Sequence, residues 1–135
     1  MFEKIRKIYD PQYFKQIVAL SEQQKELKES WDRQIKDTVA DGGKFLAVVG
    51  PCSADDVESV TLYCKKLKVI ADRVRQKIRV VVRVYTEKPH SNGEGYNGLV
   101  FDGKDGINSG LEKCRILMRN CISEGLPVAN ELLYP

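Results

Sequence analysis

The chain has 135 residues, of which 42% are hydrophobic and 30% charged, and this composition is typical of a globular domain rather than of a disordered segment. Its formal net charge is only +3, with Lys and Arg interspersed among Asp and Glu, so it lacks the basic tract expected of a nucleic-acid-binding protein. Neither a signal-peptide core nor an apolar run of about 18 residues occurs, so we expect a cytoplasmic protein with no membrane partner.

The first predicted element is a single helix at about residues 10–40, within an N-terminal helical extension of residues 1–43. Asp10 followed by Pro11 is a typical helix start, and the Asp-Gly-Gly sequence at 41–43 is a typical stop. Between them, apolar residues recur at helical spacing at Leu27, Trp31, Ile35 and Val39. Such an apolar stripe must pack against the rest of the chain or against a partner.

A β-α-β unit is predicted next. The short apolar run at 46–50 indicates a buried strand that ends in a sharp turn at Gly50. Ser53, with Asp56 three residues later, resembles a capping box, and we expect a helix from there to about residue 74. The apolar, β-branched run at 78–85 then predicts the second strand.

A long loop rich in Gly and Asn, at about 86–106, follows the second strand, and its length favours a functional role. Asn108 and Ser109 are expected to cap a third helix, which Gly125 closes. The apolar stretch at 127–133 predicts a third strand.

The order of these elements predicts an α/β fold in which an N-terminal helix precedes β-α-β-α-β. Alternating strands and helices imply parallel strands joined by right-handed crossovers. Two crossover helices on one face leave the other face and the last strand edge without cover. We therefore expect residues 44–135 to form the first three strands and two helices of an incomplete (β/α)8 TIM-type barrel. In the alternative, the N-terminal helix covers the bare face.

Residues that can carry chemistry lie at the predicted carboxyl ends of the strands, where β/α barrels place their active sites. These are Cys52, the pair Arg83 and Lys88, and Glu131. Each has a plainer interpretation: a structural thiol, a solvated lysine, or an Arg83–Glu131 ion pair in place of an anion bound to Arg83. The other three cysteines are expected to be small buried hydrophobes, namely Cys64, Cys114 and Cys121.

Five motifs together resemble the class I 3-deoxy-D-arabino-heptulosonate 7-phosphate (DAHP) synthases, from about residue 44 to the end of the sequence. They are GPCSADD (50–56), RVYTEKP (83–89), GYNGL (95–99), DGINSGL (105–111) and EGLPVANELL (124–133). The GPCS strand end also occurs in related aldol-type enzymes, whereas RVYTEKP at this distance is much more restricted. The resemblance implies the aldol-type condensation of phosphoenolpyruvate with erythrose 4-phosphate, the first step of the shikimate pathway to the aromatic amino acids. It also implies a β/α barrel and a divalent metal (manganese, iron, cobalt or zinc).

The same resemblance implies roles for single residues. Cys52 would be a metal ligand, because the thiolate is the form that binds metal. Arg83 and Lys88 would be the catalytic residues that hold the carboxylate of phosphoenolpyruvate, and Lys88 would also lie near the aldehyde oxygen. Glu131 stands where the family keeps a carboxylate close to the substrate.

Two departures from the family pattern bear on these roles. The family follows Lys-Pro with Arg-Thr, which grips the phosphate of erythrose 4-phosphate, whereas the substrate-binding stretch here reads Pro89, His90 and Ser91. The loop is also one residue longer and carries Glu94, whose charge opposes phosphate binding. The second departure is that the family's other metal ligands, a His, a Glu and an Asp, lie on later strands beyond this sequence. Cys52 alone cannot form a catalytic metal site, which needs about three protein ligands.

We therefore expect this chain to be inactive alone and to need a complementing C-terminal chain or a homo-oligomer. The alternative is a non-catalytic remnant or protein-binding module that associates with a synthase. A third hypothesis, a different aldol-type phosphoenolpyruvate transferase on the same barrel, is disfavoured by RVYTEKP at 83–89.

Overall fold

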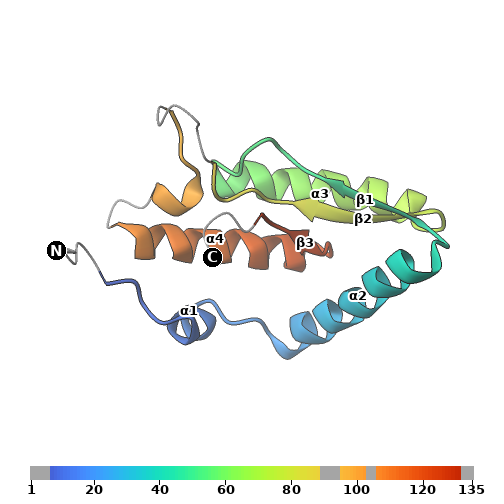
Figure 1. Ribbon diagram of the computed structural model, residues 1–135, viewed down its shortest axis with the longest axis horizontal. Helices are drawn as coiled ribbons and strands as arrows, with labels where there is room; N and C mark the ends of the chain where they lie inside the picture. Colours follow the sequence, from blue (N-terminus) through green and yellow to red (C-terminus); the bar gives the residue numbers. More distant parts are fainter. Residues whose placement is uncertain (1–6, 89–94, 103–105, 132–135) are drawn as a thin grey trace.

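The computed structural model describes residues 7–88, 95–102 and 106–131, and Figure 1 shows how their helices and strands are arranged. The elements are α1 (Pro11–Ile17), α2 (Glu22–Asp41), β1 (Phe45–Val49), α3 (Val57–Val74), β2 (Ile78–Arg83), the 3-10 helix η1 (Leu99–Phe101), α4 (Ile107–Ser123) and β3 (Val128–Ala129). This order confirms the predicted α/β fold class. Across these ranges, no helix is both long enough and apolar enough to span a membrane.

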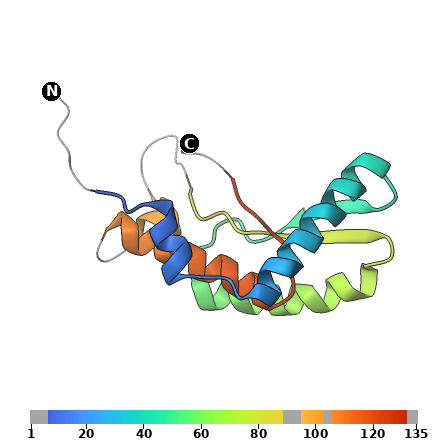
Figure 2. The ribbon, with the colours of Figure 1, turned by 90° about the horizontal axis from the view of Figure 1, so that it is seen from below.

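The three strands form one parallel sheet in the order β1-β2-β3. In the register of the sheet, Phe45 is paired with Ile78, and Arg83 is paired with Ala129. Neighbouring parallel strands need crossover connections, and α3 and α4 provide them. Figure 2 shows these two helices together on one side of the sheet, in contact with each other. The arrangement is three strands of an incomplete barrel, as predicted.

The hydrophobic core lies between the sheet and these two helices. Val82 and Val84, which alternate with the arginines of β2, are fully buried against them. The helices contribute a stripe of buried residues at helical spacing: Val60, Cys64 and Leu67 from α3, and Cys114, Leu117 and Cys121 from α4. The three predicted buried thiols are confirmed, and burial raises the pKa of the Cys114 thiol to about 12.

The opposite face of the sheet carries Arg79 and Arg83. Within the described residues, a helix covers this face only near the N-terminal ends of the strands. There α2 crosses the starts of the strands (Figure 2), and Arg79 Nε donates a hydrogen bond of 2.9 Å to Thr38 Oγ1 while Nη1 contacts Gln34. Val48, on the same face of β1, is still 46% exposed. The alternative in which the N-terminal helix covers the bare face is therefore confirmed only in part, at the N-terminal ends of the strands.

The predicted single N-terminal helix is wrong, because the chain breaks between α1 and α2. The side chains of Ser21 and Gln24 bond to each other's main-chain N–H groups in a capping box that starts α2. Arg115 of α4 donates to the carbonyls of Phe14 and Val18 at the end of α1, and both of these apolar side chains are buried. The break lets α1 pack on α4, which a straight helix would not allow.

Two predicted helix caps are wrong as well. The helix α3 begins after Asp56, whose carboxylate accepts a 2.7 Å hydrogen bond from the main-chain N–H of Ser59, so Ser53 lies outside the cap. The helix α4 begins after Gly106, and Asn108 inside its first turn bonds instead to main-chain atoms of the N-terminal segment at residues 7 and 9. The third strand is described only at Val128–Ala129, and residues 132 and 133 of its predicted span lie outside the described residues.

Replacing Asp56 with Ala should lower the free energy of unfolding near neutral pH, and this difference should disappear in acid. Hydrogen bonds from the side chain and main chain of Ser59 hold the pKa of Asp56 below its ordinary value of 3.8. The ionised cap therefore stabilises the fold above that value, and its contribution is lost as the pH falls through the folded-state pKa. Urea unfolding of Asp56→Ala at a series of pH values measures the effect, with Asp55→Ala as the neighbouring control. A difference that does not change with pH would contradict the assignment.

Candidate functional site

The carboxyl ends of β1 and β2 bring three of the sequence-predicted residues together. Lys88 Nζ lies 3.1 Å from Cys52 Sγ, although the two residues are far apart in sequence. Arg83 reaches the same turn, where its Nη2 donates hydrogen bonds of 3.0 Å and 3.1 Å to the carbonyls of Gly50 and Pro51. Cys52, Arg83 and Lys88 are called the strand-end cluster below.

Gly50 is what lets the two strand ends approach so closely. A Cβ atom at this position would stand 1.9 Å from the carbonyl oxygen of Arg83 and 2.8 Å from its carbonyl carbon. Both are main-chain atoms that cannot move aside without shifting β2, so only glycine fits. The close approach places the turn that carries Cys52 directly beside the start of the RVYTEKP segment.

Arg83 is oriented by the main chain and by an aromatic ring, and not by a carboxylate. Its guanidinium carbon lies 4.6 Å from the centre of the Tyr85 ring, a cation–π distance. Among the described residues, no carboxylate lies within ion-pair distance of Arg83, and Glu131 is exposed. The internal Arg83–Glu131 pair considered from the sequence is thus not formed here.

The segment that carries Lys88 is held by the loop that returns to it. The main-chain N–H of Lys88 donates a 3.0 Å hydrogen bond to the carbonyl of Asn97. The next residue, Gly98, has φ of 103°, and a Cβ there would lie 2.4 Å from the carbonyl oxygen of Thr86. The GYNGL motif therefore has a physical role, because it packs main chain against main chain beside Lys88.

Asn130 links the ends of β2 and β3 and was not among the predicted site residues. Its Oδ1 accepts from the main-chain N–H of Thr86 at 3.3 Å, and its Nδ2 donates to Thr86 Oγ1 at 2.9 Å. Thr86 is only 1% exposed, so this double contact satisfies a buried hydroxyl two residues before Lys88. The signal in the sequence was an amide side chain within the apolar stretch of the predicted third strand.

Unsatisfied polar atoms concentrate in this region. In the described ranges, the buried side-chain atoms that lack a hydrogen-bond partner are Ser53 Oγ, Arg83 Nε and Glu87 Oε2. All three belong to the GPCSADD or RVYTEKP motifs. Buried polar groups normally have a partner, so exceptions confined to one region are typical of a site that a ligand or further protein groups complete. Glu87 was not among the residues predicted from the sequence.

The described residues do not by themselves fit a catalytic metal. Cys52 offers one exposed thiol, and no group of three or more His, Cys, Asp or Glu side chains that could hold an ion occurs within the described ranges. A catalytic metal needs about three protein ligands. The predicted substrate-binding residues Pro89, His90 and Ser91 lie outside the described residues.

Comparison with known proteins gives a consistent result. The sequence model of the DAHP synthetase I family matches residues 18–135. The Tyr-sensitive phospho-2-dehydro-3-deoxyheptonate aldolase of Escherichia coli (strain K12) is 34% identical over 130 residues, which are 93% of this chain and 36% of that protein. The phospho-2-dehydro-3-deoxyheptonate aldolase of Amycolatopsis methanolica is 37% identical over 99 residues, which are 70% of this chain and 48% of that protein.

A solved structure shows the same relation in three dimensions. The phospho-2-dehydro-3-deoxyheptonate aldolase from Francisella tularensis SCHU S4 superposes with a TM-score of 0.88 at 28% sequence identity. The superposition covers 98% of this chain and 40% of that chain. The present chain thus spans less than half the length of each of these three relatives.

Proposed function

Because this chain belongs to the DAHP synthetase I family, we propose that its strand-end cluster is part of a site that condenses phosphoenolpyruvate with erythrose 4-phosphate, a transferase reaction of the shikimate pathway. The observation that carries the proposal is the convergence of Cys52, Arg83 and Lys88 on one turn. The chain covers only 36% of the Escherichia coli relative, so the proposed activity belongs to a site that further β/α units complete.

Arg83 and Lys88 are proposed to hold the carboxylate of phosphoenolpyruvate. The Nη2 group of Arg83 is engaged by two carbonyls, which leaves Nη1 and the unpartnered Nε as the donors for the carboxylate. Lys88 carries three N–H donors and directs one of them at Cys52 Sγ. Its remaining donors are available for the carboxylate and for the aldehyde oxygen of the second substrate, where a fixed cation stabilises developing negative charge.

We further propose that Cys52 contributes one ligand to a divalent metal, which is manganese, iron, cobalt or zinc. Such an ion, when bound, acts as a Lewis acid toward a substrate oxygen. The other ligands must come from outside the described residues, because the strand-end cluster alone does not provide enough metal-binding side chains. Glu131 and the stretch Pro89, His90 and Ser91 are proposed to border the substrates.

The division of the chain follows the same proposal. Residues 1–43 are a helical extension, and residues 44–135 are the first three strands and two helices of the barrel. Free thiols at all four cysteines are compatible with a reducing compartment, so we place the protein in the cytoplasm. Its proposed partners are the two phosphorylated substrates and either a complementing C-terminal chain or a second copy.

A non-catalytic module that associates with a synthase is the second candidate. The observation that favours it is the amount of exposed apolar surface: Phe45 of β1 is 70% exposed, and Leu62 and Ile70 of α3 are 52% and 54% exposed. Within the described residues, neither the outer edge of β1 nor that of β3 pairs with another strand. Such surface suits association with further protein, with or without catalysis.

Complementation tests the proposed function. We expect no heptulosonate phosphate from phosphoenolpyruvate, erythrose 4-phosphate and manganese with the 135-residue chain alone. A fusion of this chain to the remaining barrel of the Escherichia coli relative should be active, and Cys52→Ala should abolish that activity.

The other outcomes are equally informative. Activity of the chain alone that is abolished by Cys52→Ala would show a site assembled between copies. A folded but inactive fusion would contradict the catalytic proposal and favour the binding module. In that case the chain should instead alter the rate of an intact synthase without adding a site of its own.

A further inference from the structure

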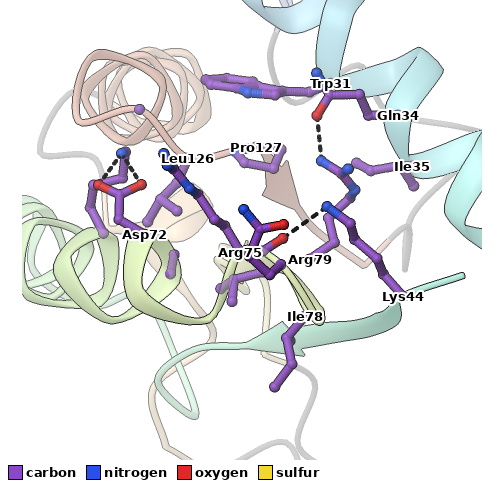
Figure 3. Close-up of a pocket in the computed structure, with 15 residues that line it drawn as sticks. Trp31, Gln34, Ile35, Lys44, Asp72, Arg75, Ile78, Arg79, Leu126 and Pro127 are labelled. Carbon is purple, nitrogen blue, oxygen red and sulfur yellow. Dashed lines mark hydrogen bonds and ion pairs between the residues drawn. The ribbon is translucent and has the colours of Figure 1, made fainter.

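A cavity of about 320 Å³ lies at the end of the sheet opposite the strand-end cluster. It is bordered by α2, by the last turn of α3, by the start of β2 and by the loop that precedes β3. Figure 3 shows Trp31 on one side of this cavity, with Arg75, Arg79 and Lys44 on the other. None of these residues belongs to the motifs that carry the proposed function.

The lining of the cavity is strongly cationic. It includes Lys44, Lys68, Arg75 and Arg79, against the single carboxylate of Asp72. Lys68 is neutralised by that carboxylate, since its Nζ lies 2.6 Å from both oxygens. Three positive charges from three different parts of the chain thus face one space without an acidic partner on its lining. Like charges that share one space repel one another, and a bound anion would relieve that repulsion.

The three cations also have more donors than the protein uses. Arg79 is fixed by its contacts with Thr38 and Gln34, which occupy two of its five N–H groups. Lys44 Nζ donates one hydrogen bond of 2.8 Å to the carbonyl of Arg75. The Arg75 guanidinium has no hydrogen bond or ion pair with any described side chain. The cavity is therefore rich in hydrogen-bond donors, and Arg79 and Lys44 are held in place. A ligand rich in hydrogen-bond acceptors would complement it.

The rest of the lining is apolar. Trp31 and Ile35 come from α2, Ile78 from β2, and Leu126 and Pro127 from the loop before β3. The lining thus combines cationic groups with an indole and aliphatic groups, which matches a ligand with a charged end and an apolar end. Guanidinium groups pair well with phosphate oxygens, and an indole face packs well on a planar ring.

We propose that this cavity binds a small phosphate monoester that carries a planar apolar group. The phosphate lies among Arg75, Arg79 and Lys44, and the ring lies against Trp31. The site is separate from the strand-end cluster, so its occupancy does not depend on the proposed catalytic function.

The single tryptophan of the chain provides a direct readout, because Trp31 lines the cavity. Phenyl phosphate added to the 135-residue chain should change the Trp31 fluorescence saturably, with a dissociation constant below about 1 mM by calorimetry. Affinity should fall as salt is raised, because screening weakens exposed charge pairs. Inorganic phosphate and phenol, which each supply one half of the ligand, should bind at least about tenfold more weakly.

Paired arginine variants localise the site. Arg75→Gln should weaken phenyl phosphate about tenfold or more, because it removes a charge-assisted contact. Arg73→Gln, an exposed arginine of α3 outside the cavity, should leave the affinity unchanged. Circular dichroism verifies that both variants are folded. Absence of a saturable signal, equal affinity of wild type and Arg75→Gln, or inorganic phosphate binding as tightly as phenyl phosphate would each overturn the proposal.

Discussion

Lys88→Met in the fused synthase should lower kcat by about two to four orders of magnitude, the range expected when a positioned proton donor or charge-stabilising group is lost. The structural reason is the position of the ammonium group, which stands 3.1 Å from Cys52 Sγ on a segment pinned by Asn97. Steady-state kinetics with both substrates measures the effect. Methionine is unbranched and keeps most of the length of the lysine side chain, so the loss reports mainly on the ammonium group.

The matched control is Lys66→Met, an exposed lysine on α3 that lies away from the strand ends. It should leave kcat and both KM values within about twofold of the parent, as surface substitutions usually do. Circular dichroism verifies that each fused variant keeps its structure. An unchanged kcat in folded Lys88→Met would remove Lys88 from the catalytic proposal.

Gly50→Ala should destabilise the chain by at least about 1–3 kcal/mol, the usual cost of forcing extra atoms into a packed region. The added Cβ would stand 1.9 Å from the carbonyl oxygen of Arg83 and 2.9 Å from its Cβ, so the ends of β1 and β2 must separate. Separation also breaks the hydrogen bond from Arg83 to the Gly50 carbonyl. Urea unfolding of the 135-residue chain gives the difference in the free energy of unfolding.

Gly43→Ala provides the comparison for this substitution. A Cβ at Gly43 meets no atom within 4 Å, and its backbone is not in the left-handed region. Alanine there should be neutral or stabilising by up to about 1 kcal/mol, because it restricts the unfolded chain. If Gly50→Ala and Gly43→Ala had the same stability, the close approach of the two strand ends would be wrong. Activity in the fused synthase should fall for Gly50→Ala only.

Much of the fold could be predicted from local patterns. The buried stripe of α4, with Cys114, Leu117 and Cys121, follows from helical spacing of apolar residues. The parallel order of the strands follows from the alternation of strands and helices. The proximity of Cys52, Arg83 and Lys88 was expected because the carboxyl ends of parallel strands meet at one edge.

Some errors arose where distant groups outweighed a local pattern. The stripe through Leu27, Trp31 and Ile35 was correctly helical, but the break before it was missed, although Ser21 and Gln24 give a local capping-box signal for it. Arg115 of α4, which binds the end of α1, adds a contact from a distant element. A side chain contributed from a distant helix cannot be read from the local spacing. Asn108 was expected to cap its own helix and instead bonds to the N-terminal segment, for the same reason.

By itself, the sequence determined which residues stand at the strand ends and which faces of the helices are buried, because both follow from short-range periodicity and from where apolar runs stop. Only the tertiary structure decided what those residues touch. Asn130 contacts buried Thr86 only because folding brings the ends of two strands together. The same is true of Gly50, where the main chain of the neighbouring strand leaves no room for a side chain. The cationic cavity beside Trp31 arises in the same way, since its charges come from separate elements that only folding brings around one space.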